Sequence, residues 1–249
     1  MTDLDDDLWD RATLRRLRAG ETDVLLEGHS LAPVLQQAGQ ALLRAGSAAD
    51  RDLIRRCVAG LRDRDAAGDD VLAVEVLAEF GEPVTSEHLS WPLTAVPVDL
   101  EMLAGFLDGD SLQGDGAVDL FTGNVYPPGS LDWDRPEEPD EDSETFDPDR
   151  WLYFQPESGE AYRDMLDFAA GLADGPLREQ LFSALEGRGP FRQFRNVLKA
   201  DDQLTRWTLF RDERQLGRAR AWLARAGYRA VWQTDGNPIG AVTPTRPAD

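Results

Sequence analysis

The chain has 249 residues, of which 41% are hydrophobic and 8% aromatic, and its formal net charge at pH 7 is -21. This composition predicts a folded protein with a sizeable core rather than a disordered chain. The acidic balance disfavours non-specific binding to nucleic acid or anionic lipid, and no apolar stretch reaches the length of a membrane span. Since the first ten residues are acidic and the chain has one cysteine, we expect a cytoplasmic protein with no intramolecular disulfide and no membrane partner.

The N-terminal region, residues 1–90, is predicted to be helical. The stretch "SLAPVLQQAGQALLRAG" has Ser30 as its expected N-cap and Gly46 as its stop. The next stretch, "SAADRDLIRRCVAGLRDRDAAG", has Ser47 as its expected N-cap, and "DDVLAVEVLAEFG" predicts a third helix. Cys57 lies on the apolar face of the middle helix, which favours a buried side chain over a reactive thiol.

The middle of the chain contains the turns and strands. Residues 82–97 carry three prolines and predict an irregular connector. Asp99 is the expected N-cap of a short helix in "VDLEMLAGFLDG", and "AVDLFTGNVYPP" predicts a β-hairpin whose turn uses Gly123. Residues 131–150 hold ten acids, two arginines and three prolines, which predicts a mobile, solvated acidic loop, and "WLYFQP" predicts a strand after it.

The remainder of the chain predicts mostly helices. "SGEAYRDMLDFAAGLA" and "GPLREQLFSALEG" come first, and in the corner "GRGPF" that follows, Gly189 and Pro190 start another helix. Phe191 and Phe194 are expected to anchor that helix in the core, because they share an apolar stripe with Leu198. The long stretch "LTRWTLFRDERQLGRARAWLARAG" predicts the last helix, and "YRAVWQT" predicts a closing strand.

The fold class is therefore α+β and predominantly helical. We expect a helical N-terminal region at residues 1–90 and an α+β domain at residues 97–235, followed by a C-terminal tail at residues 236–249. The α+β domain combines a β-hairpin, one or two further strands and about four helices.

Several of these pieces recur in a fixed order and carry a family resemblance. They are "VDLEMLAGFLDG", "DLFTGNV", an acidic spacer, "WLYFQP" with "GEAYRDMLDF", "ALEGRGPFRQFRNVL" and "RARAWLARAGY". In this order they resemble an uncharacterised bacterial protein family, number zero-one-five-eight of the UPF series, over about residues 97–230. The resemblance implies a domain boundary near residue 97 and carries over no activity, cofactor or catalytic residue.

Motifs for catalysis and metal binding are weak in this sequence. "VLLEGHSLAP" imitates the nucleophile elbow of α/β-hydrolases, but only 27 residues precede Gly28, and the only histidine after Ser30 is His88. With His29 and His88 as the only histidines and one cysteine, zinc or iron sites of the usual kinds lack ligands. We therefore expect no catalytic residue, metal or other cofactor, although loose binding of Ca²⁺ or Mg²⁺ by the many carboxylates stays open.

Cations near the C-terminus form the best candidate for a binding surface. Residues 190–229 carry ten basic and four acidic side chains, a local charge of +6 (10 − 4). Arginine suits carboxylates and phosphates because its planar guanidinium bonds bidentately. The candidate anion- or partner-binding residues are Arg188, Arg192, Arg195, Lys199, Arg214, Arg218 and Arg225.

Three interpretations of these cations are open. They can bind an acidic protein or another anion, with nucleic acid disfavoured by the net charge. They can instead be solvated or form ion pairs with nearby acids. Those acids are Asp201, Asp202, Asp212 and Glu213. The acidic loop at residues 132–149 can also fold over them and screen them.

The sequence favours a cytoplasmic, non-enzymatic binding or regulatory module that uses its Arg-bearing C-terminal helices to bind a protein partner or an anion. Two alternatives are kept, an enzyme of unknown class such as a carboxylate-based hydrolase, and a structural or assembly protein. A deep pocket with perturbed carboxylates or arginines is the mark of an enzyme, and an exposed Arg-bearing surface is the mark of a binding module.

Overall fold

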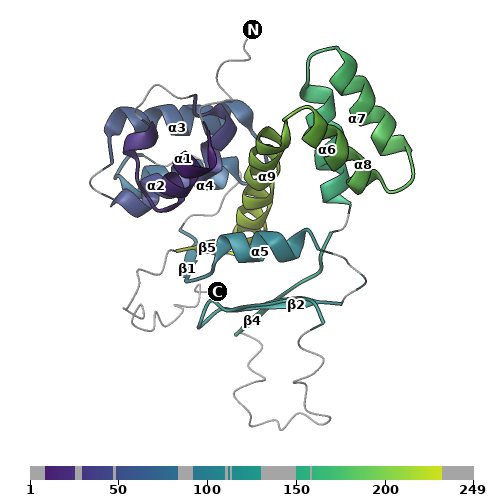
Figure 1. The fold of residues 1–249 in the computed structure, drawn as a ribbon. Coiled ribbons are helices and arrows are strands. Elements are labelled where there is room, and N and C mark those ends of the chain that lie inside the picture. The colour runs from purple at the N-terminus through teal and green to yellow at the C-terminus, as the bar shows by residue number, and fades with distance from the viewer. Residues whose placement is uncertain are drawn as a thin grey trace, which may run out of the picture. The chain divides into compact units, whose positions relative to one another are not determined.

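A computed structural model describes most of the chain, and Figure 1 shows its helices and strands. The fold is α+β and predominantly helical, as predicted. The described residues are 9–25, 30–46, 49–83, 92–109, 112, 114–129, 150–157 and 159–231.

The chain divides into two compact units. Unit 1 consists of residues 1–87 and 159–217, and unit 2 of residues 88–158 and 218–249. Each unit therefore combines two separate stretches of the sequence. The predicted division into residues 1–90 and 97–235 follows chain order instead, and it stays a prediction.

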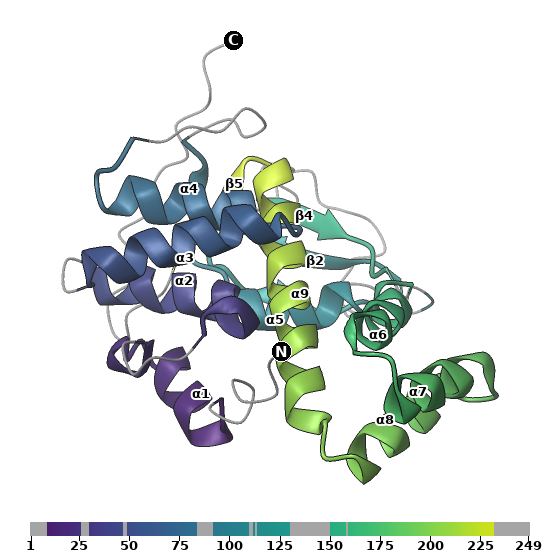
Figure 2. The same cartoon turned by 90° about the horizontal axis from the view of Figure 1, so that it is seen from above.

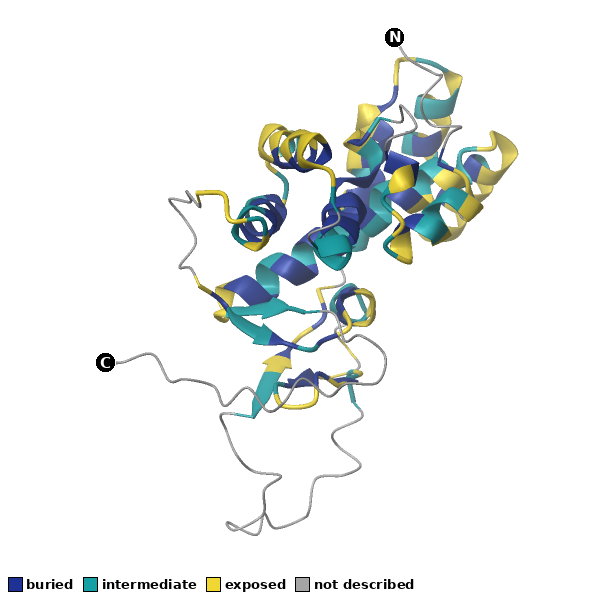
Figure 3. Cartoon of the chain, turned by 90° about the vertical axis from the view of Figure 1, so that its left-hand side faces the viewer, coloured by how far each residue is buried: buried dark blue, intermediate teal, exposed yellow. Residues whose placement is uncertain are grey.

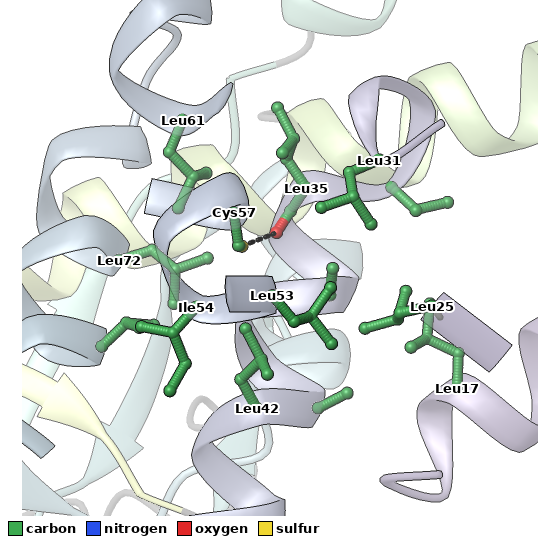
Figure 4. Packing of buried hydrophobic residues seen from close by; sticks show 14 of the residues in the cluster. Leu17, Leu25, Leu31, Leu35, Leu42, Leu53, Ile54, Cys57, Leu61 and Leu72 are labelled. Carbon is green, nitrogen blue, oxygen red and sulfur yellow. Dashed lines mark hydrogen bonds between the residues drawn. The ribbon is translucent and has the colours of Figure 1, made fainter. Parts of the chain in front are cut away.

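The first helices of unit 1 pack around one hydrophobic core. They are α1 (Arg11–Arg18), the 3₁₀ turns η2 (Asp23–Leu25) and η3 (Ala32–Val34), α2 (Leu35–Ala45), α3 (Arg51–Arg64) and α4 (Asp69–Glu79). Figure 4 shows leucines from these helices around Cys57, whose Sγ lies 3.8 Å from the Leu35 carbonyl oxygen. Burial raises the pKa of the Cys57 thiol to about 12. The prediction of a buried cysteine is therefore confirmed.

Two helix starts in unit 1 differ from the prediction. Helix α2 begins at Leu35, after η3, so Ser30 is not its N-cap. Residue Val34 occupies the N-cap position and has no side-chain acceptor, so the first amides of α2 need an acceptor from elsewhere in the chain. The N-cap of α3 is Asp50, whose Oδ1 accepts a hydrogen bond from the Leu53 amide at 3.0 Å. The expected cap Ser47 lies outside the described residues.

The later helices of unit 1 build a second, aromatic core. They are α6 (Glu160–Gly171), α7 (Pro176–Glu186), α8 (Pro190–Ala200) and the part of α9 (Leu204–Arg225) up to residue 217. The ring of Phe168 contacts the rings of Phe194, Trp207 and Phe210 edge-on, with centroids 5.3–6.3 Å apart. The predicted core role of Phe194 is confirmed, whereas Phe191 is 54% exposed, so its predicted burial is wrong.

Unit 2 contains the strands and α5 (Leu100–Leu107), which begins after Asp99 as predicted. Strands β2 (Gly116–Asp119) and β3 (Val125–Tyr126) form the predicted antiparallel hairpin, and β4 (Trp151–Phe154) pairs with the other side of β2. A separate parallel pair joins β1 (Thr94–Val96) to β5 (Tyr228–Ala230). The sequence did not predict β1, because a three-residue strand shows no alternation and its partner lies far along the chain.

The hairpin turn explains why glycine is needed at position 123. Gly123 has φ of 75°, and a Cβ there would lie 1.8 Å from the Pro97 carbonyl oxygen. Within the same turn, Asp119 Oδ1 accepts hydrogen bonds from the amides of Phe121 and Thr122, and Arg150 donates to its Oδ2 at 2.6 Å. Burial raises the pKa of Asp119, but these hydrogen bonds outweigh it, so the net shift is downward.

Candidate functional site

The α7–α8 corner has the structure that its sequence predicts. Gly187 ends α7, and Gly189 adopts φ of 68° at the N-cap position of α8, a left-handed conformation that glycine adopts without strain. Pro190 then occupies the first turn, where its missing amide is not needed. The corner sets the direction of α8, and burial of Phe194 and Leu198 fixes which side of α8 faces the aromatic core.

A stripe of cations lies on the exposed side of α8. Arg192, Arg195 and Lys199 are three and four residues apart, a spacing that places them on one side of a helix. All three are exposed, and so is Arg188 in the preceding corner. Figure 3 shows the same division of helices in this chain into buried and exposed sides. We call these four cations the α8 cations.

The α8 cations are not neutralised within the described part of the chain. No carboxylate of the described residues lies within ion-pair distance of Arg188, Arg192, Arg195 or Lys199. Their guanidinium and ammonium groups therefore face solvent with their hydrogen-bond donors available. This is the arrangement that a surface for carboxylates or other anions requires.

An exposed aromatic ring adjoins the α8 cations. Phe191 lies about 40° around the helix from Arg195. It is therefore at the edge of the apolar stripe, whereas Phe194 is at its centre. This position, in the first turn of the helix, places the Phe191 ring at the border between core and solvent. Arginine and aromatic residues together are enriched at protein–protein interfaces.

The two candidate arginines in the middle of α9 have a different environment. Arg214 donates to Asp164 Oδ1 at 2.6 Å and to Asp167 Oδ2 at 2.7 Å, and the Asp164 side chain is fully buried. Arg218 donates bidentately to both carboxylate oxygens of Asp108, at 3.2 and 2.6 Å. Both arginines therefore hold carboxylates of the folded chain, and their part in an anion-binding face stays a prediction.

Arg225, the last of the seven candidate cations, is exposed in the final turn of α9, in the part of the helix that belongs to unit 2. The structure thus places the seven candidates in three settings: the α8 cations, the two paired arginines of α9, and Arg225.

Of the four acids named in the ion-pair interpretation, Asp212 does pair with an arginine of the same stretch, Arg211, whereas Glu213 pairs with Arg64. Asp212 accepts hydrogen bonds from Arg18 at 3.0 Å and from Arg211 at 2.9 Å, and neither is a candidate cation. Asp201 and Asp202 are exposed. The acids that pair with Arg214 and Arg218 come from α6 and from the residue after α5, which local spacing does not reveal.

Glu213 forms a buried polar network that the sequence did not reveal. Its carboxylate accepts hydrogen bonds from the amides of Gln36 and Gln37, at 2.6 and 3.0 Å, and so satisfies the start of α2. Arg64 donates to Glu213 at 3.0 Å and to both oxygens of Asp69. Burial raises the pKa of Glu213, with Arg64 and the two amides opposing that shift. Every contact of the carboxylate is explained by folding, so we assign the network a structural role.

The remaining predictions concern metal binding, the two histidines, the acidic segment and membrane spans. Among the described residues, no group of three or more His, Cys, Asp and Glu side chains could hold a metal ion. The described residues do not include His29, His88 or residues 130–149 of the acidic segment. The hypothesis that this segment screens the arginines therefore stays a prediction. None of the described helices is both long enough and apolar enough to span a membrane.

Comparisons with protein-family models, with curated proteins and with solved structures gave no match. The resemblance over about residues 97–230 therefore stays an expectation from the sequence. The candidate site rests on the chain's own geometry, in which the exposed α8 cations and the exposed Phe191 lie on one helix and the corner before it.

Proposed function

We propose that the chain is a cytoplasmic, non-enzymatic binding or regulatory module, and that the exposed side of α8 binds an acidic surface of a protein partner. The observation that supports this is the contrast between the cations of α8 and of α9. Arg214 and Arg218 already hold carboxylates, whereas the α8 cations hold none within the described residues. Only unpaired cations are available to a partner without first breaking an internal ion pair.

The shape of the surface favours a compact acidic patch over a long polyanion. Helix α8 has 11 residues and is about 16 Å long, and its cation stripe from Arg192 to Lys199 is about 10 Å long. The rest of the chain has a strongly negative charge, and its field extends about 8 Å at physiological salt. A nucleic acid that continued beyond α8 would meet that repulsion, whereas a small group of carboxylates would not.

Phe191 adds an apolar contact to the charged ones. Each exposed ion pair contributes only about 0.2–1 kcal/mol, so cations alone give weak and salt-sensitive binding. A half-exposed phenylalanine that becomes covered by the partner adds hydrophobic free energy that salt does not screen. We therefore expect a partner surface that combines carboxylates with an apolar side chain.

The test compares two charge-reversal variants with the same change in net charge. The test variant is Arg192→Glu/Arg195→Glu, and the control is Arg15→Glu/Arg56→Glu, which changes two exposed arginines on α1 and α3. Each protein is immobilised, and nuclease-treated cell lysate is passed over it at physiological salt. Mass spectrometry then identifies the proteins that remain bound.

The proposal predicts a set of proteins retained by wild type and by the control but lost from the test variant. Adding salt should release the same proteins. If the test variant retains them as well as the wild type does, α8 is not the binding surface. A parallel run uses untreated lysate. If proteins are retained only from the untreated lysate, a nucleic acid is the ligand and the protein-partner proposal is wrong.

A further inference from the structure

A second surface of unit 1 lies along helices α3 and α4, which Figure 2 shows side by side. Between them is a groove of about 550 Å³. Its floor is apolar and includes Ile54 and Val58 from α3 with Leu77 and Phe80 from the end of α4. Ile54 and Val58 are almost fully buried, so the apolar surface that the floor offers to a ligand comes mainly from the half-buried Leu77 and Phe80.

The two edges of the groove carry opposite charges. Arg51, Arg55 and Arg62 line the α3 edge, and all three are exposed. The other edge carries Glu79 and Glu82. Arg51 lies 4.0 Å from Glu82 across the end of the groove.

The basic edge has donors that the described part of the chain does not use. Arg55 and Arg62 are seven residues apart, two turns along one side of α3, and neither has a carboxylate partner among the described residues. Together with Arg51 they form a row of positive charge along the groove. Such a row is matched by a row of carboxylates on whatever fills the groove.

We propose that this groove binds an amphipathic helix of a partner protein, with an apolar stripe on the floor and carboxylates along the edge that faces α3. The α3 residues that line the groove run from Arg51 to Arg62, about 16 Å along the helix, so the groove accommodates about three turns of a partner helix. The apolar floor selects an apolar stripe, and Arg55 and Arg62 select acidic residues beside it. Glu79 and Glu82 disfavour acidic residues on the opposite edge, which fixes the direction of the partner helix.

This surface is separate from the α8 cations, and it does not depend on the proposed function of α8. The two surfaces share no residue. A variant that abolishes binding at one should leave the other unchanged. Failure of either proposal is therefore distinguishable from failure of the other.

The test uses a phage-displayed library of helix-forming peptides of about four turns, selected on the full-length wild-type chain. Individual peptides are then synthesised, labelled with fluorescein and titrated by fluorescence anisotropy. The proteins titrated are wild type, Arg55→Glu/Arg62→Glu, Ala59→Trp and Arg56→Glu. Ala59 is an exposed residue in the groove wall, so tryptophan there fills the groove without a change in charge.

We expect the selection to enrich peptides with an apolar stripe and acids on one edge. Their dissociation constants should rise at least about tenfold for Arg55→Glu/Arg62→Glu, since two attractions become repulsions. Ala59→Trp should weaken binding to a similar degree. Arg56→Glu is the control, with half the charge change of the double variant. Arg56 is exposed on α3 but does not line the groove, so this variant should change binding by less than about twofold.

Three results would overturn the proposal. One is a selection that yields no peptide of this pattern. The second is binding that survives both Arg55→Glu/Arg62→Glu and Ala59→Trp. The third is equal weakening by Arg56→Glu, which would show a response to net charge and not to the groove. Binding of the same peptides to Arg192→Glu/Arg195→Glu, a variant of α8, should remain as in wild type.

Discussion

Helices α8 and α9 follow one another in the chain and have the same character in sequence, since each carries apolar residues and arginines at helical spacing. Their cations nevertheless have different environments. Arg192 and Arg195 of α8 are exposed and have no carboxylate partner among the described residues. Arg214 and Arg218 of α9 are half-buried and each holds one or two carboxylates.

The difference comes from residues far away in the sequence. Asp164 is 50 residues before Arg214, and Asp108 is 110 residues before Arg218. No comparable carboxylate approaches α8 within the described part of the chain. Whether an arginine is available to a partner is thus a property of the tertiary structure, and helical periodicity alone does not determine it.

The largest expected effect on stability is that of replacing Glu213, the buried acid of α9. Replacing Glu213 by alanine removes the acceptor for two α2 amides and one partner of Arg64. We expect the free energy of unfolding to fall by about 3–5 kcal/mol, as for other buried charge pairs that lose one partner. Urea denaturation followed by circular dichroism measures it.

Glu213→Gln serves as the control for this prediction. Its amide oxygen still accepts a hydrogen bond while the charge is lost, so it should destabilise less than alanine does. A loss below about 1 kcal/mol for Glu213→Ala would contradict the structural role assigned to the network.

The next effect tests the paired arginines directly. Arg214→Ala leaves the buried Asp164 without its guanidinium donor, which costs about 1–3 kcal/mol of stability. Adding Asp164→Asn removes the carboxylate charge that lost this donor, so the double variant should be less destabilised than the sum of the two single variants. Thermal and urea unfolding of all three variants complete the cycle. Additive losses would show that the two side chains do not interact.

The sequence predicts the local features of this fold well, because they depend on residues close together in the chain. Gly189 and Pro190 mark the corner before α8, Asp99 caps α5, and Gly123 marks the hairpin turn. Each of these signals needs only a few neighbouring residues, since it reflects backbone conformation or a hydrogen bond within one turn.

The sequence did not predict the long-range features, because they depend on residues far apart in the chain. The start of α2 depends on Glu213, which is 177 residues away from Gln36, and no local pattern indicates that pairing. Strand β1 exists because it pairs with β5 from the other end of the chain. For the candidate site, the sequence selected the right kind of residue, but only the structure separates the α8 cations from Arg214 and Arg218.

A smaller effect on the free energy of unfolding is expected when the pH is lowered, because Asp119 of unit 2 is paired with Arg150. The folded state lowers the pKa of Asp119, to which Arg150 and two amides donate hydrogen bonds. The folded state therefore binds this proton less readily than the unfolded state does. The resulting stability is present above the ordinary pKa of 3.8 and is lost as pH falls through the lower, folded value.

Asp119→Asn tests that prediction. Urea midpoints of wild type and variant are measured from neutral pH down into the acid range. The gap between them should narrow as the pH falls, since wild type loses the contribution that the variant never has. A constant gap over the whole range would show that Asp119 does not titrate differently in the folded and unfolded states.

The smallest expected effect on stability is that of replacing the exposed arginines of α8. Arg192→Ala and Arg195→Ala remove exposed side chains that hold no carboxylate in the described part of the chain. Each should change the free energy of unfolding by less than about 0.5 kcal/mol in urea denaturation, in contrast to Arg214→Ala. A loss comparable to that of Arg214→Ala would mean that these arginines stabilise the fold, and it would contradict the proposal that they are available to a partner.

A negligible loss of stability, combined with lost binding in Arg192→Glu/Arg195→Glu, would separate function from stability on this helix. A residue that contributes to binding but not to folding has its partner outside the chain.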